Sequence, residues 1–144
     1  MADRVSCSCL CGAVRYHVRI DTDRVKACHC RMCQKWAGGI SLAIDCDPQI
    51  EIADETHVGI YQSSDWGERV FCTRCGSPLF WRMRDGSFAN LPPSAIDDAR
   101  DFALSTEYCI DRKPGYYSLE GDTERLTEAE MVALYSEPSE HSHG

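Results

Sequence analysis

The sequence predicts a mostly-β protein, and three observations support this fold class. Short segments alternate apolar and polar side chains, as strands with one buried face do. Glycine and proline residues interrupt these segments at short intervals. Helical signals are confined to two short segments. We therefore expect small sheets joined by turns, together with short helices, one of them near the C-terminus.

The expected strands lie in the first two thirds of the chain and share alternation or enrichment in β-branched and aromatic residues. In chain order they cover residues 14–20, 40–46, 49–52, 57–61, 68–71, 79–83 and 88–91. A helical turn is expected from Arg31 to Trp36, ended by the Gly38-Gly39 pair. The spacing of Thr127 and Glu130 predicts a capping box that begins a second helix.

The length of 144 residues predicts one domain, which we place at residues 1–138, before a flexible tail at 139–144. His141 and His143 lie in that tail, where we expect them to be solvated. No window has the roughly 20 apolar residues of a membrane span, and the N-terminal residues lack the apolar stretch of a signal peptide. We therefore expect a cytoplasmic protein without membrane contact.

The charge balance is acidic. Fifteen lysines and arginines against 23 aspartates and glutamates give a net charge of −8. Because such a surface repels phosphate backbones, we expect no general nucleic-acid binding. The overall charge does not exclude a local basic patch. The candidate residues for one are Arg69 with Arg74, Arg82 with Arg84, and Arg31 with Lys35.

The chain contains ten cysteines, an unusual number for its length. Without an export signal we expect a reducing compartment, where clustered thiolates hold metal more often than they form disulfides. The cysteines that show ligand spacing form three groups, which are Cys9-x-Cys11-Gly12, Cys28-His29-Cys30-x-x-Cys33 and Cys72-x-x-Cys75-Gly76.

The third group predicts half of a zinc site. A Cys-x-x-Cys-Gly turn points both sulfurs at one ion, and Gly76 permits the positive φ that such a turn requires. Cys9 and Cys11, which also precede a glycine, are the natural complement. Together the two pairs predict a four-thiolate site that is closed to solvent and structural. Cys72 and Cys75 alone could instead form a redox dithiol, although the βαβ pattern around such motifs is missing.

The second group supplies three cysteines within six residues, namely Cys28, Cys30 and Cys33. Three protein ligands with one exchangeable position are typical of catalytic zinc. Alternatively, a fourth residue closes the site and makes it structural, and the candidates for that role are Cys7, His29, Cys46 and Cys109. We expect the His29 side chain to point away from the metal, because it lies between two ligands.

Three thiolates would leave a zinc site with a net charge of −1, which weakens its Lewis acidity. Activation of water is then less favourable than activation of an incoming thiol, whose pKa the metal lowers. We hypothesise that Cys28, Cys30 and Cys33 form a catalytic site for addition of a thiol to a small electrophile.

The three groups and their flanks resemble the glutathione-dependent formaldehyde-activating (Gfa, CENP-V/GFA) family. The resemblance rests on Cys9-x-Cys11-Gly12-Ala13-Val14-Arg15-Tyr16, Cys28-His29-Cys30-x-x-Cys33-x-Lys35 and Phe71-Cys72-x-x-Cys75-Gly76-x-Pro78-Leu79-Phe80, and it covers about residues 6 to 118. It implies small antiparallel sheets around zinc, a fold often described as a β-tent. It also implies two Zn²⁺ ions per chain, structural on Cys9, Cys11, Cys72 and Cys75, and catalytic on Cys28, Cys30 and Cys33.

The activity implied by the resemblance is addition of glutathione to formaldehyde, the reverse of a carbon–sulfur lyase reaction. The partners would be a small-molecule thiol and an aldehyde. One departure from the family concerns a late segment, where Glu107 replaces a histidine and Tyr116 a tryptophan. A carboxylate beside a net-negative zinc site would repel an anionic thiol such as glutathione.

Three tryptophans, Trp36, Trp66 and Trp81, could line a pocket, but we expect large aromatics to lie in the core. Arg31, Lys35, Arg82 and Arg84 could grip the carboxylates of glutathione or be solvated surface charges. Two alternatives to an enzyme remain. One is a zinc domain with two structural sites that binds a partner, and the other is a redox or metal-handling protein that uses Cys7, Cys46 and Cys109.

Overall fold

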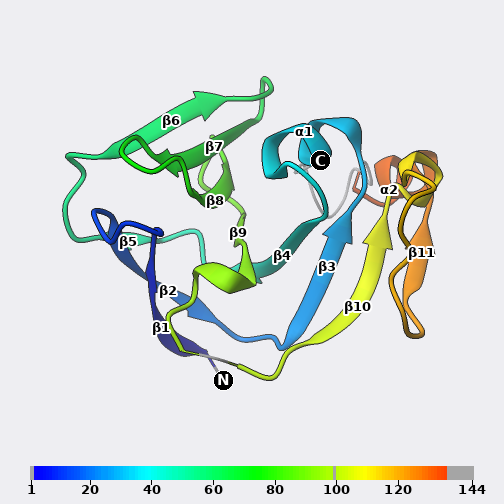
Figure 1. Cartoon of the computed structure of the whole chain (residues 1–144), viewed down its shortest axis with the longest axis horizontal. Helices are drawn as coiled ribbons and strands as arrows, with labels where there is room; N and C mark the ends of the chain where they lie inside the picture. Colours follow the sequence, from blue (N-terminus) through cyan, green and yellow to red (C-terminus); the bar gives the residue numbers. More distant parts are fainter. Residues whose placement is uncertain (1, 99, 136–144) are drawn as a thin grey trace. The chain divides into compact units, whose positions relative to one another are not determined.

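The computed structural model describes residues 2–98 and 100–135 (Figure 1). The chain forms two compact units, one from Met1–Thr22 and Ile44–Asp101, the other from Asp23–Ala43 and Phe102–Gly144. We call them the first and the second unit. The mostly-β prediction is confirmed, whereas the single domain at 1–138 stays a prediction. The predicted tail, with His141 and His143, lies outside the described residues.

The first unit contains a three-stranded antiparallel sheet. Its strands are β1 (Asp3–Ser8), β2 (Arg15–Ile20) and β5 (Glu51–Ile52), in the order β1-β2-β5. Every second side chain of β2 is buried, which confirms the alternation predicted from residue 14 onwards. The sheet forms because β1 and β2 are joined by the short turn that carries the first cysteine pair.

The same unit contains an antiparallel meander that runs β9-β8-β7-β6, with the second half of β4 beside β9 (Figure 1). The strands are β4 (Ser41–Cys46), β6 (Val58–Gln62), β7 (Gly67–Cys72), β8 (Pro78–Met83) and β9 (Ala89–Leu91), and a 3₁₀ turn, η1 (Pro93–Ala95), follows them. The predicted segments match these strands to within a few residues. The connection from β7 to β8 carries the Cys72-x-x-Cys75 turn.

An apolar core supports the first unit. Tyr16 is fully buried, its hydroxyl donates to the carbonyl oxygen of Leu79 at 2.6 Å, and its ring lies 5.6 Å from that of Phe80. This hydrogen bond satisfies the one polar atom that the tyrosine carries into the core. The other buried apolar residues of this unit include Val5, Val14, Val18, Ile20, Ile44, Val70, Leu79, Met83, Leu91 and Ile96.

The second unit differs from the expected antiparallel arrangement. Strand β10 (Ala103–Tyr108) pairs in parallel with both β3 (Arg24–Cys28) and β11 (Glu124–Leu126). The prediction of antiparallel sheets is therefore correct for the first unit and wrong for this one. Parallel pairing requires a long connection between neighbouring strands, and here most of the chain separates β3 from β10. That distance is why local sequence patterns did not indicate it.

Two helices and a 3₁₀ turn complete the second unit. They are α1 (Arg31–Ala37), η2 (Ile110–Arg112) and α2 (Glu128–Tyr135). Helix α1 ends at Gly38, whose left-handed φ of 75° forms the predicted C-cap. The capping box of α2 is confirmed, because the N–H of Glu130 donates to the hydroxyl of Thr127 and the N–H of Thr127 donates back to the carboxylate of Glu130.

Four strands, β1, β3, β10 and β11, were not predicted. Strand β10 shows the reason most clearly, because its fully buried positions are Thr106 and Glu107 rather than apolar residues. In β3 only Val25 and Ala27 are buried. Strands that are short, or that have polar residues on the buried face, do not show the alternation on which prediction depends. Strand β1 does alternate, with Val5 and Cys7 buried, and was missed all the same.

Candidate metal centres

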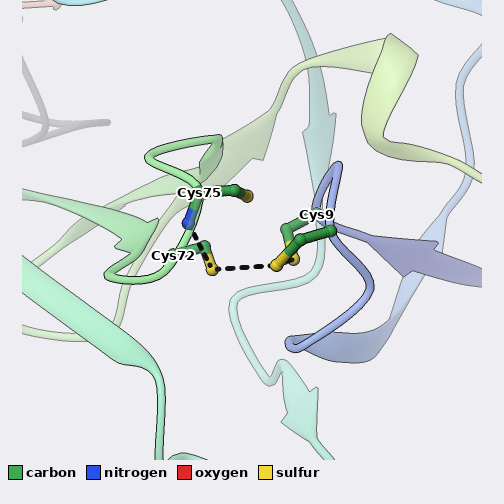
Figure 2. A group of neighbouring side chains, drawn as sticks. Cys9, Cys72 and Cys75 are labelled. Atoms are coloured by element: carbon green, nitrogen blue, oxygen red, sulfur yellow. Dashed lines mark hydrogen bonds between the residues drawn. The ribbon is translucent and has the colours of Figure 1, made fainter.

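The first unit brings Cys9, Cys11, Cys72 and Cys75 together, with all four Sγ atoms within 4.8 Å of one another. Figure 2 shows Cys9 facing Cys72 and Cys75 from the opposite turn. The Sγ atom of Cys11 lies 3.6 Å from that of Cys9 and 3.9 Å from that of Cys72. In a tetrahedral site with Zn–S bonds of about 2.3 Å, sulfurs lie about 3.8 Å apart. The predicted grouping therefore fits a four-thiolate zinc site.

The two turns resemble each other. Gly12 and Gly76, the glycines after each cysteine pair, both have a φ of +81°. The N–H of Gly12 donates to the carbonyl of Cys9, and the N–H of Gly76 donates to that of Cys72. The positive φ predicted for Gly76 is confirmed. A residue with a Cβ would be strained at either position, so the sequence requires glycine there.

Hydrogen bonds from the protein favour charged thiolates at this site. The hydroxyl and the backbone N–H of Ser77 hold the pKa of Cys75 at about 5. Burial and the Cys75 thiol raise the pKa of Cys9, but the backbone N–H of Val14 and the thiols of Cys11 and Cys72 lower it overall. The N–H groups of Arg74 and Cys75 lie 3.4 Å from the Sγ of Cys72. Donors on these sulfurs stabilise the form that binds metal.

The expectation that this site is sealed from solvent is wrong for one ligand. The side chain of Cys11 is exposed, while Cys9 and Cys72 are buried. Cys11 belongs to the tight turn after β1. This turn lies at the surface, as the 89% exposure of Leu10, the residue before Cys11, also shows. The backbone N–H of Ala13 lowers the pKa of Cys11, but burial and the other thiols raise it to about 11.

The second unit brings Cys28, Cys30 and Cys33 together, and their Sγ atoms also lie within 4.8 Å of one another. Cys28 is the last residue of β3, and Cys30 is the N-cap of α1, where its Sγ accepts the N–H of Cys33 at 3.3 Å. A strand end followed directly by a helix start thus turns all three thiols to one point. All three side chains are half-buried, so the group has access to solvent.

In this second group the neutral thiol is favoured for Cys28 and Cys30. The pKa of Cys28 is raised, first by a hydrogen bond with the thiol of Cys109 and then by one with Cys30. The Cys28 thiol lowers the pKa of Cys30. The Cys33 thiol and burial raise this pKa by more, so the net shift is upward. Three soft sulfur donors in this spacing fit zinc, and metal must displace their protons to bind.

Cys109, one of the candidates to close this site, is fully buried at the end of β10. It has a left-handed φ of 58°, and its Sγ also contacts the Sδ of Met131 at 4.0 Å. Its sulfur does not lie within 4.8 Å of all three Sγ atoms of Cys28, Cys30 and Cys33. In this structure Cys109 therefore does not supply a fourth ligand atom to the group of three cysteines.

His29 was another candidate for the fourth ligand. The prediction that its side chain contacts other residues instead is confirmed. Its ring is fully buried, with Nδ1 2.9 Å from the hydroxyl of Tyr117 and Nε2 2.9 Å from a carboxylate oxygen of Glu107. Tyr117 had no signal in the sequence, since it lies 88 residues away from His29.

The structure corrects the role expected for Glu107. Its side chain is 1% exposed, and its second oxygen accepts the hydroxyl of Thr123 at 2.6 Å and Nε of Arg125 at 3.4 Å. Burial raises its pKa, but these hydrogen bonds and that of His29 lower it overall. The carboxylate is thus ionised and compensated inside the second unit, and it does not present an open charge to an anionic thiol.

The remaining cysteines, Cys7 and Cys46, have no ligand partners in the two groups. Burial raises the pKa of each thiol to about 12, with additional contributions from Asp97 for Cys7 and from Asp45 for Cys46. Thiols so hard to ionise are poor nucleophiles and poor metal ligands. This disfavours the redox or metal-handling hypothesis, which depended on these two residues and Cys109.

The expectation that the three tryptophans lie in the core is wrong. Trp66 is 48% exposed, and Trp36 and Trp81 are half-buried. Trp81 instead packs against Gly67 on the neighbouring strand, where an added Cβ would lie 2.7 Å from the indole ring.

The basic residues separate into two kinds. Arg82 forms an ion pair with Glu68 at 2.7 Å, and Arg84 donates to the carbonyl oxygen of Asp65. Both belong to the meander of the first unit. Arg31 and Lys35 are exposed on α1, the helix that carries Cys33. Of the four residues, these two share an element with the three-cysteine group.

Fold and site together define a mostly-β protein with two cysteine groups that could each hold a metal ion. Among the described residues, no helix has the length and apolar character needed to cross a bilayer. A model of the glutathione-dependent formaldehyde-activating enzyme (GFA) family matches residues 4–111. The chain belongs to this family, as the order of its cysteine groups predicted.

Known proteins that resemble the chain agree with this assignment. An uncharacterised lyase of Schizosaccharomyces pombe is 28% identical over 128 residues, which cover 87% of this chain and 92% of that protein. A Halomonas elongata protein, provisionally named a glutathione-dependent formaldehyde-activating enzyme, is 40% identical over 83 residues, covering 51% of this chain and 52% of that protein. A crystal structure of a Rhodobacter sphaeroides protein shares the fold, with a TM-score of 0.56 at 18% identity, covering 66% of this chain and 90% of that one.

Proposed function

We propose that the chain is a zinc-dependent enzyme of the carbon–sulfur lyase type, which adds a thiol to formaldehyde or another small aldehyde. Glutathione is the first candidate for the thiol. The observation that carries the proposal is the group of Cys28, Cys30 and Cys33, three half-buried thiols whose Sγ atoms lie within 4.8 Å of one another. Among the described residues, no fourth histidine, cysteine, aspartate or glutamate places a ligand atom within 4.8 Å of all three. Membership of the GFA family and the name of the S. pombe relative support the lyase class.

The reaction itself is simple. The thiol sulfur forms a bond to the carbonyl carbon, the carbon–oxygen π bond opens, and the thiol proton ends on the oxygen. The product is a hemithioacetal, which is an S-hydroxymethyl compound when the aldehyde is formaldehyde. A zinc ion with one exchangeable ligand position would stabilise the thiolate form of the substrate at neutral pH. The chain's own contribution is to hold Cys28, Cys30 and Cys33 as one ligand face, and to leave the substrate side open to solvent.

Arg31 and Lys35 are the residues we propose for recognition of an anionic thiol. Both are exposed on α1, which begins at the three-cysteine group. Arg31 Nη1 approaches the side-chain oxygen of Gln34 only at 3.4 Å, so its guanidinium can turn to a carboxylate. With Glu107 buried and compensated, these cations favour glutathione over a neutral thiol. Replacement of both by glutamine should raise KM for glutathione more than for 2-mercaptoethanol.

The proposal is tested by exchange NMR of thiol and formaldehyde. Zinc-loaded protein should accelerate interconversion between free and hydroxymethylated glutathione, and Cys30→Ser should lose this acceleration. Cys46→Ser is the matched control, because it also removes a cysteine but lies outside both groups. Equal exchange rates for the wild-type protein and Cys30→Ser, with several thiols, would remove the enzymatic assignment.

A second candidate function is a zinc-binding domain with two structural sites, used for partner binding. Cys109 favours it, because this buried thiol forms a hydrogen bond with Cys28 and could move to close the second site. The two candidates differ in whether added thiol changes the visible spectrum of the cobalt-loaded protein. An exchangeable position predicts a change on adding glutathione, whereas a site closed by Cys109 predicts none until Cys109→Ala opens it.

A further inference from the structure

The peptide between Cys28 and Cys30 is fixed by hydrogen bonds on both of its sides. The N–H of His29 donates to the carbonyl oxygen of Tyr108 at 2.9 Å. Its carbonyl oxygen accepts the side-chain amide of Gln34 at 2.7 Å, and the same amide nitrogen donates to the carbonyl oxygen of Arg112 at 3.0 Å. Because this residue joins two of the three candidate ligands, fixing it also limits the directions of their thiols.

The ring of the same residue is fixed just as completely. Its Nδ1 meets the hydroxyl of Tyr117 and its Nε2 the carboxylate of Glu107, each at 2.9 Å, and the ring has no exposed surface. Every polar atom of His29 is therefore engaged within the second unit. A histidine between two metal ligands would otherwise be a competitor for the same ion, since imidazole is a strong zinc ligand.

The direction of these hydrogen bonds follows from their partners. An ionised carboxylate only accepts, so Nε2 carries a proton and donates to Glu107. In the neutral ring Nδ1 then accepts the proton of the Tyr117 hydroxyl, and in the charged ring it donates to that oxygen. In both forms neither nitrogen has a lone pair left for a metal. The imidazole is thus excluded from the fourth ligand position.

The far end of this chain of hydrogen bonds is anchored too. The second oxygen of Glu107 accepts from Thr123 and Arg125, which precede and belong to β11. On the other side, Tyr117 is held by Lys113, whose ammonium donates to the carbonyl oxygen of Tyr117 and lies 5.2 Å from its ring centroid. Strand β10, which carries Glu107, and the segment after it, which carries Tyr117, therefore hold the two ring nitrogens of the imidazole.

We propose that Tyr117 and Glu107 are positioning residues of the three-cysteine site, acting through His29. They hold the peptide that joins Cys28 to Cys30, so that both thiols face one ion, and they withhold the imidazole, so that the fourth position stays available to a substrate. The inference rests on the proposed metal site and concerns how the protein keeps that site open. Neither residue belongs to the group of candidate ligands.

The first test removes one oxygen atom and compares two adjacent tyrosines. In Tyr117→Phe the ring remains but Nδ1 of His29 loses its partner, whereas Tyr116→Phe changes a side chain that is 82% exposed. Full-length proteins are loaded with cobalt(II), and affinity is measured by competition with a chelator. Loss of a partner that orients a metal site typically costs 10–100-fold in affinity. We expect about 10-fold weaker binding at the three-cysteine site for Tyr117→Phe and no change for Tyr116→Phe.

The second readout is the visible spectrum, which reports ligand geometry and which a merely structural role would leave unchanged. A Cys30→Ser protein supplies the reference spectrum of the four-cysteine site alone. We expect the bands of the three-cysteine site to shift in Tyr117→Phe, because the released imidazole can approach the metal. In the Glu107 series the shift should be smaller for Glu107→Gln, which can still accept from His29, than for Glu107→Ala. If Glu107→Ala does not fold, Tyr117→Phe decides alone.

The outcomes are distinguishable from those that test catalysis. Unchanged spectrum and affinity in both Tyr117→Phe and Glu107→Gln would overturn the positioning role, even if the protein is an active enzyme. Equal weakening at both metal sites would also overturn it, because the effect would then be general. A wild-type protein that binds two cobalt ions, shows the expected variant effects and has no thiol–aldehyde activity would instead retain the positioning role and remove the proposed function.

Discussion

The two units hold their cysteines by different means. In the first unit the ligands lie on two glycine-ended turns, and protein hydrogen bonds lower the pKa of Cys9 and Cys75. In the second unit the ligands lie where β3 meets α1, and the pKa values of Cys28 and Cys30 are raised. Hydrogen bonds therefore favour two of the four thiolates in the first unit, although the pKa of Cys11 is raised to about 11. In the second unit we infer that the packing of the peptide between Cys28 and Cys30 holds their thiols in place.

The side chains buried around the two cysteine groups also differ, because one unit has an apolar core and the other a polar network. The first unit has an apolar core of valine, leucine, isoleucine and aromatic side chains. The buried residues of the second unit include His29, Thr106 and Glu107, which form or adjoin a hydrogen-bonded network. A buried polar network costs free energy unless every member is bonded, but it defines orientation more sharply than apolar packing does. We therefore predict that metal at the four-cysteine site stabilises the fold, and that the hydrogen-bonded network of the second unit holds the three-cysteine site in place.

The largest expected effect is loss of the first unit's metal. Cys72→Ser should unfold or aggregate the chain, since structural zinc contributes apparent binding free energies of about 10–16 kcal/mol to small zinc folds. Cys30→Ser should leave the fold intact and remove only the second metal. Circular dichroism and elemental analysis measure both, with two zinc ions expected for the wild-type protein. The comparison fails if Cys30→Ser unfolds the chain as severely as Cys72→Ser.

The second prediction concerns acid release of zinc. Ligand thiols must lose their protons to bind metal, so a raised thiol pKa lets protons displace the metal at higher pH. As pH falls, the three-cysteine site should therefore release its zinc first, and the four-cysteine site only at lower pH. Zinc release followed with a colour indicator, in wild type and in Cys30→Ser, separates the two steps. A single step in the wild-type protein would contradict the electrostatic difference.

A smaller effect is expected from the close packing of the meander. An added Cβ at Gly59 would lie 2.5 Å from the ring of Phe71, which precedes the candidate ligand Cys72. Gly59→Ala should cost about 1–3 kcal/mol of unfolding free energy, as overpacking typically does. Gly39→Ala is the matched control, because nothing lies within 4 Å of its Cβ and its φ is not left-handed. Urea denaturation measures the unfolding free energy of both variants. Equal losses of unfolding free energy would mean that the Phe71 ring moves aside at no cost.

The smallest expected effect concerns the start of α2. Thr127→Ala removes a hydroxyl that accepts the N–H of Glu130 at 3.1 Å, and an N-cap change of this kind costs about 1 kcal/mol. Thr127→Ser keeps the hydroxyl and should retain most of the stability. The three-cysteine site should keep its cobalt spectrum in both variants, because α2 supplies none of its ligands. A spectral change in Thr127→Ala would show that α2 supports the site.

Much of the candidate site was predictable because ligand spacing is a local property. The thiols of Cys28, Cys30 and Cys33 converge because they lie on one strand end and one helix start, within six residues. The four-cysteine group was predicted by chemistry, since two half-sites of two ligands each need a partner. The strands whose alternation is apolar were predictable for the same local reason. Strand β10 was not, because Thr106 and Glu107 occupy its buried positions.

The sequence by itself determined the mostly-β class, the two cysteine groups, the glycines of their turns and the caps of both helices, because each depends on residues a few positions apart. Only the tertiary structure decided that β3 and β10 pair in parallel and that Glu107 is buried against His29, 78 residues away. It also decided that Tyr117 lies on the other ring nitrogen. Contacts between residues so far apart depend on how the strands assemble, and no local pattern records which polar side chain will meet which partner.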